Sequence, residues 1–243
     1  MSVSLSKGQR VDLTKGRPSL KNILVGLGWD INHYDGEADF DLDASVFMTK
    51  ENDKVGKDED FIFYGNLEHS SKSVKHMGDN RTGEGDGDDE VIKIKLDKIP
   101  SDYETLAVTV TIYDAESRLQ NFGMVGNAYV RVVDEETGEE LIRFDLSEDF
   151  STETALVVAE IYKHNGEWKF KAVGSGYNGG LKALCNQYGI DADAMRSALD
   201  TDERSRIERD ENYTMVLVNI PNIETHNDKE LYDTIPLSIF VVK

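Results

Sequence analysis

Hydrophobic and polar residues alternate with a period of two along most of the chain before residue 180. This period is typical of strands that bury one face, and helical periodicity is nearly absent in this part of the sequence. The pattern predicts strands over residues 22–28, 40–48, 61–64, 91–96, 105–113, 128–134, 140–145, 155–163 and 167–173.

Turn residues between these segments indicate how the strands are connected. Asn165-Gly166 is a strong signal for a two-residue hairpin, and the sequence EETG at 135–138 is typical of a four-residue one. Hairpins join antiparallel strands, and βαβ units would need helices between the strands. The sequence therefore predicts a mainly β fold, an antiparallel β-sandwich.

After residue 180 the pattern changes. A short helix is predicted over 181–188 and a longer, charged helix over 192–209, followed by two apolar strands over 213–220 and 235–242. We therefore expect two parts, a sandwich over residues 1–190 with short C-terminal helices and an α+β extension over residues 191–243. The extension is expected to pack on the sandwich or to contact another chain.

Charge excludes several classes of partner. The 243-residue chain has 27 basic and 47 acidic residues, a net charge of −20, which repels phosphate backbones and makes direct nucleic-acid binding unexpected. One cysteine, Cys185, allows no internal disulfide and no thiolate zinc site. No apolar stretch approaches the ~20 residues that span a bilayer, and the amino terminus lacks the apolar region of a signal peptide. We expect a cytoplasmic protein.

The negative charge is concentrated in two windows. Residues 30–43 carry −6 and contain no Lys or Arg, and residues 79–90 carry −5 with Arg81 as their one basic residue. Like charges at this density repel one another, so a positive group is expected to offset them. The acids of the two windows are Asp30, Asp35, Glu37, Asp39, Asp41, Asp43, Asp79, Glu84, Asp86, Asp88, Asp89 and Glu90.

The spacing of these acids favours a hard divalent cation. In residues 39–47, DFDLDASVF, the period of two places three carboxylates on one face of a half-buried strand. Glycines in the second window permit turns that aim carbonyl oxygens inward. Many flexible oxygen donors suit Ca²⁺ better than Mg²⁺, although an acidic run is also typical of a solvated surface. Neither window has the spacing of an EF-hand.

Other motifs give less support for a function. The sequence GSGYNG at 174–179 matches a dinucleotide-binding pattern, but it follows a predicted antiparallel hairpin, and the alternative is a glycine-rich exit into a helix. The five histidines lack metal-ligand spacing and are expected at the surface or in loops. Cys185, Trp29 and Trp168 are expected in the core, and no nucleophile motif is present, so we expect no enzyme.

Long stretches of the sequence resemble the TerD family of tellurium-resistance and general stress proteins. The resemblance covers residues 1 to about 190 and includes LSKGQRVDLTK, VGLGWD, FDLDASVF, DFIFYGNL, GDNRTGEGDGDDEVIKIKL, HNGEWKFKAVGSGY and GGLKAL. It implies a calcium-binding β-sandwich found with other Ter proteins, and it does not imply an enzyme. Other Ter-type proteins of the stress system are therefore the expected partners. It does not account for the extension after residue 190.

The acidic motifs of the family coincide with the two windows. They fall on Asp30, Asp39, Asp41, Asp43, Asp79, Asp88, Asp89 and Glu90, and the resemblance adds Thr82 and Gly83 as possible oxygen donors. We expect these residues to bind one or two Ca²⁺ ions.

Three functions are compatible with such a site. The first is a calcium-dependent interaction or scaffold module of a stress response. The second is calcium-bridged binding to anionic lipid or to a phosphorylated ligand, the only way in which we expect a membrane to be a partner. The third, an enzyme that uses the ions as Lewis acids on a phosphorylated substrate, has the least support.

Overall fold

The computed structural model describes residues 2–30, 39–78, 87–146, 150–194, 214–215 and 241–242. The chain divides into two compact units, Met1–Met195 and Arg196–Lys243. Within the described residues, no helix is both long and apolar enough to cross a bilayer.

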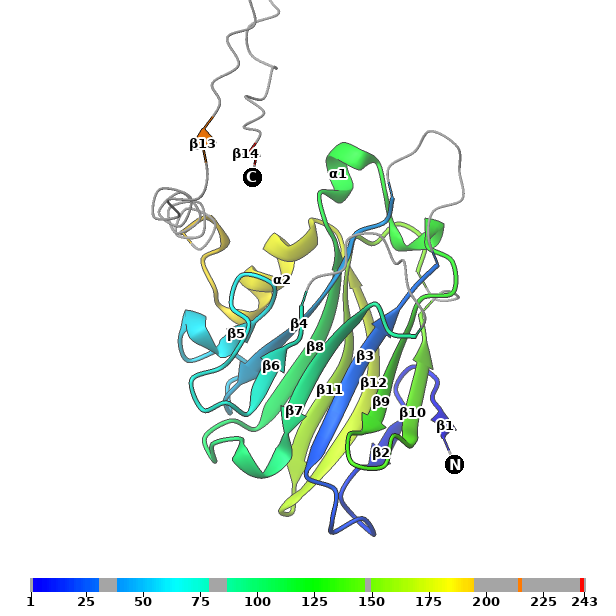
Figure 1. Ribbon diagram of the computed structural model, residues 1–243, viewed down its shortest axis with the longest axis vertical. Coiled ribbons are helices and arrows are strands. Elements are labelled where there is room, and N and C mark those ends of the chain that lie inside the picture. The colour runs from blue at the N-terminus through cyan, green and yellow to red at the C-terminus, as the bar shows by residue number, and fades with distance from the viewer. Residues whose placement is uncertain are drawn as a thin grey trace, which may run out of the picture. The chain divides into compact units, whose positions relative to one another are not determined.

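The first unit is built from two sheets that face each other (Figure 1). Sheet A has the strand order β1-β10-β9-β3-β7-β6, and sheet B has the order β2-β12-β11-β8-β4-β5. All pairings are antiparallel except that of β1 with β10. The strands of sheet A are β1 (Val3–Ser4), β10 (Glu140–Asp145), β9 (Tyr129–Asp134), β3 (Asn22–Gly28), β7 (Glu90–Lys95) and β6 (Val74–His76). Those of sheet B are β2 (Arg10–Asp12), β12 (Glu167–Tyr177), β11 (Ala155–His164), β8 (Thr105–Ile112), β4 (Leu42–Thr49) and β5 (Phe61–Ile62). The predicted mainly β sandwich is confirmed.

Short helices and turns lie between these strands and after the last of them. They are the single-turn α1 (Ala115–Arg118), α2 (Gly180–Tyr188), and the 3-10 turns η1 (Asp58–Asp60), η2 (Leu96–Lys98) and η3 (Phe122–Met124). The two predicted hairpins are present. His164 pairs with Glu167 across Asn165 and Gly166, which have φ values of 52° and 81°, and β9 pairs with β10 across residues 135–138.

The core lies between the two sheets. Alternate side chains of each strand point into it, for example Ile23, Val25 and Leu27 of β3, all at most 3% exposed. Trp29 and Trp168 belong to this core, as predicted. Burying these side chains is the main force that holds the two sheets together.

Strand β4 is buried on both faces, whereas the alternating pattern predicted a half-buried strand. On the face away from the core, the Phe47 ring stacks on Phe61 of β5 at 4.1 Å and on Tyr188 of α2 at 4.4 Å. Helix α2 therefore covers the side of sheet B that the sequence pattern assigned to solvent. β4 also begins at Leu42, so Asp39 and Asp41 precede the strand.

The dinucleotide-like sequence at 174–179 belongs largely to a strand. Ser175, Gly176 and Tyr177 pair with β11, and α2 begins only at Gly180. The hydroxyl oxygen of Thr154 accepts the N–H groups of Gly179 and Gly180, at 3.2 and 3.0 Å. These glycines form the entry to α2, which agrees with the alternative interpretation of the motif.

The second unit is described at four residues, where β13 (Thr214–Met215) pairs antiparallel with β14 (Val241–Val242). These residues lie in the two strands predicted for the extension. The rest of those strands lies outside the described residues, and so does the predicted helix after residue 194.

Candidate metal site

Trp29 connects the two acid-rich windows at the end of the sandwich where β3 ends. Its backbone N–H donates to the carboxylate of Asp89 at 3.0 Å, and its indole N–H donates to the carbonyl of Phe40 at 3.2 Å. The backbone N–H of Asp89 in turn donates to Leu27 at 2.8 Å. Residues separated by 60 positions are thus held together. We call this end, with Asp30, Asp39, Asp41, Asp43, Asp88, Asp89 and Glu90, the acid end.

Glu90 links the two sheets at the acid end. The strand alternation of β7 points its side chain between the sheets, where it is 1% exposed. Its carboxylate accepts the backbone N–H of Ala44 at 2.6 Å. That N–H is available because β5 pairs with β4 only at Val46 and Phe47. Glu90 therefore supplies the hydrogen-bond acceptor that a neighbouring strand would otherwise supply.

A buried histidine faces the same carboxylate. His76 is 1% exposed, and its Nε2 lies 3.4 Å from the nearer Glu90 oxygen. Its Nδ1 accepts the N–H of Gly78 at 3.3 Å, which places the proton of a neutral ring on Nε2. Glu90 thus has partners in both sheets, and its bond to Ala44, the residue after Asp43, brings the two windows together a second time.

Asp88 lies on the opposite side of sheet A, on its outer face. Its Oδ1 accepts from Arg131 Nε at 2.7 Å and from the Tyr129 hydroxyl at 3.1 Å. Its carboxylate rests on Gly26, where an added Cβ would lie 2.0 Å from Oδ2. Arg131 is therefore a positive group that offsets part of the acidic charge.

We expect Gly26→Ala to destabilise the protein by about 1–3 kcal/mol, because the new methyl group overlaps the Asp88 carboxylate. Urea unfolding measures this loss. In the Asp88→Ala background the same change removes no ion pair and meets no carboxylate, so it is expected to cost much less. Equal losses in both backgrounds would contradict this account.

Asp30, Asp88 and Asp89 lie close enough to affect one another. Burial raises the pKa of the Asp89 carboxyl, and the negative charges of Asp88 and Asp30 raise it further, while the hydrogen bond from Trp29 lowers it. Asp30 is exposed, and its carboxylate accepts from Asn127 Nδ2 at 2.6 Å. Acids of the two windows therefore influence one another electrostatically.

The stretch 39–43 supplies the most buried acids of the acid end apart from Glu90. Asp41 and Asp43 are 7% and 6% exposed, and Asp39 is exposed. The backbone carbonyl of Asp39 accepts from Gln120 Nε2 at 3.3 Å, and that of Asp41 accepts from the Tyr113 N–H at 2.8 Å. Main-chain contacts thus fix this stretch against the loop that follows β8.

No group of three His, Cys, Asp or Glu side chains in the described part of the chain is arranged to hold a metal ion. Asp79, Thr82 and Gly83 lie outside the described residues. Asp30 and Asp89 lie together at the end of β3, Asp41 and Asp43 flank the start of β4, and Asp88 and Glu90 are turned to opposite sides of sheet A. The predicted donors that the structure describes are therefore brought to one end without being gathered at one point.

A second buried polar cluster was missed by sequence reasoning. Asp60, fully buried, accepts from the Tyr103 hydroxyl at 2.7 Å, and its Oδ1 lies 3.3 Å from Nε2 of His69. Burial and the bond to Asp60 raise the pKa of Tyr103. The prediction of surface or loop histidines was wrong for His76, which is buried in β6, whereas His69 lies in a loop as predicted but is buried there. The lack of metal-ligand spacing, the only basis of that prediction, says nothing about burial.

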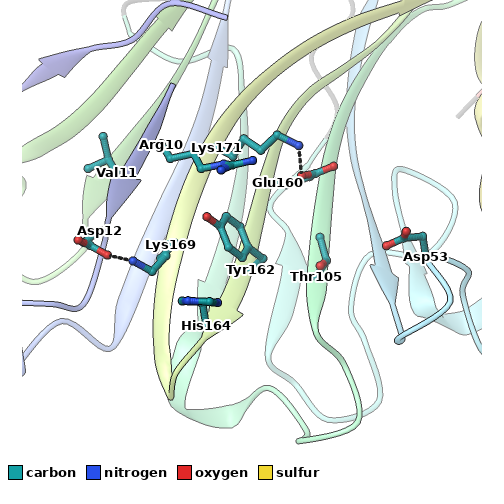
Figure 2. A pocket seen from close by; sticks show the side chains of 10 residues that line it. All are labelled: Arg10, Val11, Asp12, Asp53, Thr105, Glu160, Tyr162, His164, Lys169 and Lys171. Atoms are coloured by element: carbon teal, nitrogen blue, oxygen red, sulfur yellow. Dashed lines mark hydrogen bonds and ion pairs between the residues drawn. The ribbon is translucent and has the colours of Figure 1, made fainter. Parts of the chain in front are cut away.

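The outer face of sheet B holds a hollow of about 670 Å³ between β2 and β8 (Figure 2). Four of its charged side chains form two pairs, with Lys171 2.7 Å from Glu160 and Lys169 bound to Asp12. Figure 2 shows the Tyr162 ring between these two pairs. Because none of the predicted metal ligands lines the hollow, it is separate from the acid end.

Comparisons with known proteins agree on one family. A family model described as the TerD domain matches residues 1–188. The tellurium resistance protein TerD of Serratia marcescens is 59% identical over 192 residues, covering 79% of this chain and 100% of the relative. General stress protein 16U of Bacillus subtilis (strain 168) is 56% identical over 190 residues, covering 78% of this chain and 98% of the relative.

An uncharacterized protein of Bacillus subtilis (strain 168), YceE, is 62% identical over 190 residues, covering 78% of this chain and 99% of that protein. Among solved structures, a homologue of telluride resistance protein (TerD) from Streptomyces coelicolor A3(2) has a TM-score of 0.57 at 22% identity. That match covers 68% of this chain and 95% of the other and shows a shared fold. Residues after 188 lie outside the family model.

Proposed function

Because this chain belongs to the TerD domain family, we propose that it is a calcium-binding, non-enzymatic stress-response protein that acts as a Ca²⁺-dependent interaction or scaffold module. The observation that carries the proposal is the double hydrogen bonding of Trp29, which joins the Asp89 and Phe40 stretches. Two acidic segments that repel each other are held in contact, so a cation between them would stabilise the fold.

The donors at the acid end suit calcium. They are carboxylate and carbonyl oxygens, the ligands that Ca²⁺ prefers, in a set large enough for six to eight contacts. Asp39, Asp41, Asp43 and Asp89 would hold the ion or ions, together with Asp79, Thr82 and Gly83. Asp88 and Glu90 already bind Arg131 and Ala44, so their part would be to fix the positions of Asp89 and Asp43. Asp30 would contribute charge beside Asp89.

The proposal includes no catalysis. Cys185, the single cysteine, is 1% exposed, and burial raises the pKa of its thiol to about 11, so it is a poor nucleophile.

Other Ter-type stress proteins are the proposed partners, and the cytoplasm, where a lone reduced cysteine is usual, is the proposed location. Calcium would then act as the switch that orders the acid end for a partner.

We expect calcium to raise the melting temperature relative to the protein in EDTA. At 100 times its dissociation constant, one bound ion adds about 2.7 kcal/mol. In a domain of this size that is a rise of roughly 5–10 °C. Differential scanning calorimetry with and without Ca²⁺ measures the shift, and calorimetric titration gives the number of ions.

Asp89→Asn separates charge repulsion from metal binding. The pKa of Asp89 is raised, so its ionised form is less stable in the folded protein than in the unfolded chain, and it lowers stability at neutral pH. Without metal the variant is therefore expected to melt at or above the wild-type temperature, whereas its calcium shift should fall by at least half. Asp97→Asn, an exposed acid beyond the other end of β7, is the control. A full calcium shift in Asp89→Asn would count against the site.

A further inference from the structure

Leu119 is displayed at the surface in a conformation that disfavours it. Its side chain is 83% exposed, and its backbone φ is +55°, in the left-handed region. Glycine or asparagine is usual at such a helix end, because a bulky side chain crowds the backbone there. The fold thus holds a large apolar side chain in water, with no burial in return.

The backbone of Leu119 is fixed by the turn it closes. Its N–H bonds to the carbonyl oxygens of Ala115 and Glu116, which ends the single turn of α1. Asp114, at the other end of that turn, also has a left-handed φ of 53°. Each end of this single helical turn therefore has one residue with a left-handed backbone conformation, Asp114 before it and Leu119 after it.

The loop that contains this turn is part of the acid end. Arg118 Nη1 and Gln120 Nε2 both donate to the backbone carbonyl of Asp39, at 3.4 and 3.3 Å. Tyr113, 47% exposed, lies at the start of the loop, and the Arg118 guanidinium lies 5.3 Å from its ring centre. Figure 1 shows α1 projecting beyond the strand ends of the sandwich. An exposed apolar side chain, an exposed aromatic one and the partly buried guanidinium of Arg118 therefore lie next to Asp39, a candidate calcium ligand.

We propose that Leu119 and Tyr113 form a tip that inserts into an anionic lipid surface, while bound calcium and Arg118 contact the phosphate groups of the lipids. The inference rests on the proposed calcium function. A chain with a net charge of −20 is repelled by anionic headgroups, so cations at the contact are required. Interfacial insertion suits leucine and tyrosine, with the hydroxyl kept at headgroup level.

The size of the tip favours lipid over a protein partner. A stable protein interface buries about 800 Å² on each side around a central cluster of anchors. Within the described residues, the loop after β8 offers two exposed large hydrophobic side chains, Tyr113 and Leu119. Two side chains suffice for shallow insertion beside an electrostatic contact. The binding free energy of such a contact comes from attraction to the charged lipid surface and does not need a large buried area.

Vesicle sedimentation tests the proposal. Wild-type protein is expected to pellet with phosphatidylcholine vesicles containing phosphatidylserine when Ca²⁺ is present, and to stay in solution with EDTA or with pure phosphatidylcholine. Leu119→Gly is expected to weaken this binding at least about fivefold, since the inserted apolar surface is lost. The same variant should unfold at an equal or higher urea concentration, because glycine relieves the left-handed strain.

Leu67→Gly is the matched control, because Leu67 is 46% exposed but lies in the loop before β6. Leu119→Trp gives a second readout. Trp29 and Trp168 are buried, so a calcium-dependent blue shift on vesicles would come from the new residue. Pelleting that Leu119→Gly leaves unchanged would overturn the proposal, as would equal effects of the two glycine variants.

Calorimetric titration of Ca²⁺ distinguishes this failure from failure of the proposed function. Calcium binding without vesicle binding would overturn the lipid tip and leave the calcium site standing. Absence of calcium binding would overturn both. Leu119-dependent capture of a purified Ter-type protein, with no vesicle binding, would assign the tip to a protein partner and overturn the lipid proposal.

Discussion

Replacing Glu90 with alanine is expected to lower the free energy of unfolding by about 3–5 kcal/mol. The carboxylate is buried, and it accepts the N–H of Ala44 at 2.6 Å while Nε2 of His76 lies 3.4 Å away. Both of these groups are polar, and the alanine variant leaves the Ala44 N–H without its acceptor in a place that water does not reach. The variant also removes a contact between the two sheets at the start of β4.

Urea unfolding of Glu90→Ala, Glu90→Gln and Glu160→Ala measures how much of this loss is specific. Glutamine keeps one acceptor oxygen for Ala44, so its loss should be smaller. Glu160 is a partly exposed acid on sheet B, paired with Lys171 at 2.7 Å, and its removal should cost less than about 1 kcal/mol. Similar losses for Glu90→Ala and Glu160→Ala would show that the link between the sheets contributes little.

The Glu90 result also bears on its role at the acid end. If Glu90 fixes Asp43 rather than binding calcium itself, Glu90→Gln should weaken calcium binding less than Asp43→Asn does. Titrations of the two variants at the same protein concentration compare the two losses directly. A larger loss of calcium affinity in Glu90→Gln than in Asp43→Asn would indicate that Glu90 is itself a calcium ligand.

The strands of the sandwich could be predicted because their signals are local. β3 and β10 were predicted at their observed bounds, since their patterns of apolar residues end at clear turn residues. The hairpin at Asn165 and Gly166 was predicted because both residues tolerate a positive φ. β1, β2 and β6 were missed, because two or three residues are too few for a period and their pairing depends on strands far away in the sequence.

Three consecutive acids show why the site was harder to predict than the fold. Asp88, Asp89 and Glu90 were one cluster in the sequence, but the structure sends their carboxylates to three places. Asp88 lies over Gly26 on the outer face of sheet A, Asp89 bonds to the backbone of Trp29, and Glu90 lies between the sheets. Their separation depends on where β7 begins, and strand ends are the least certain part of any sequence pattern. The partners Ala44, Trp29 and Arg131 become neighbours only through sheet pairing.

The buried cluster around Asp60 leads to the second large expected effect. Asp60→Ala should lower the free energy of unfolding by about 3–5 kcal/mol, because four groups converge on this one carboxylate. Its Oδ2 accepts the N–H groups of Gly56 and Lys57 at 3.0 and 3.2 Å, and its Oδ1 accepts the Tyr103 hydroxyl at 2.7 Å. His69 is the fourth, with its Nε2 3.3 Å from Oδ1.

The tautomer of a neutral His69 ring follows from its other contacts. Its Nδ1 accepts the backbone N–H of Ser71 at 3.2 Å, so the proton of the neutral ring is on Nε2 and points to Asp60. Alanine at position 60 would therefore leave buried donors from two separate segments, Tyr103 and the loop before β6, without an acceptor. Asparagine keeps one acceptor oxygen but turns an N–H₂ group toward donors, so its loss should remain above that of Tyr103→Phe.

Because Asp60 joins η1 to the loop that carries His69, its loss should loosen this region before the rest of the sandwich. Amide hydrogen exchange in Asp60→Ala is expected to speed up over residues 56–74, while β3 and β11 stay protected in the core. Asp58→Ala, an exposed acid in the same 3-10 turn, should leave both stability and exchange close to wild type. If exchange instead rose evenly across both sheets, the η1 loop would unfold only together with the two sheets. Asp60 would then support the whole fold.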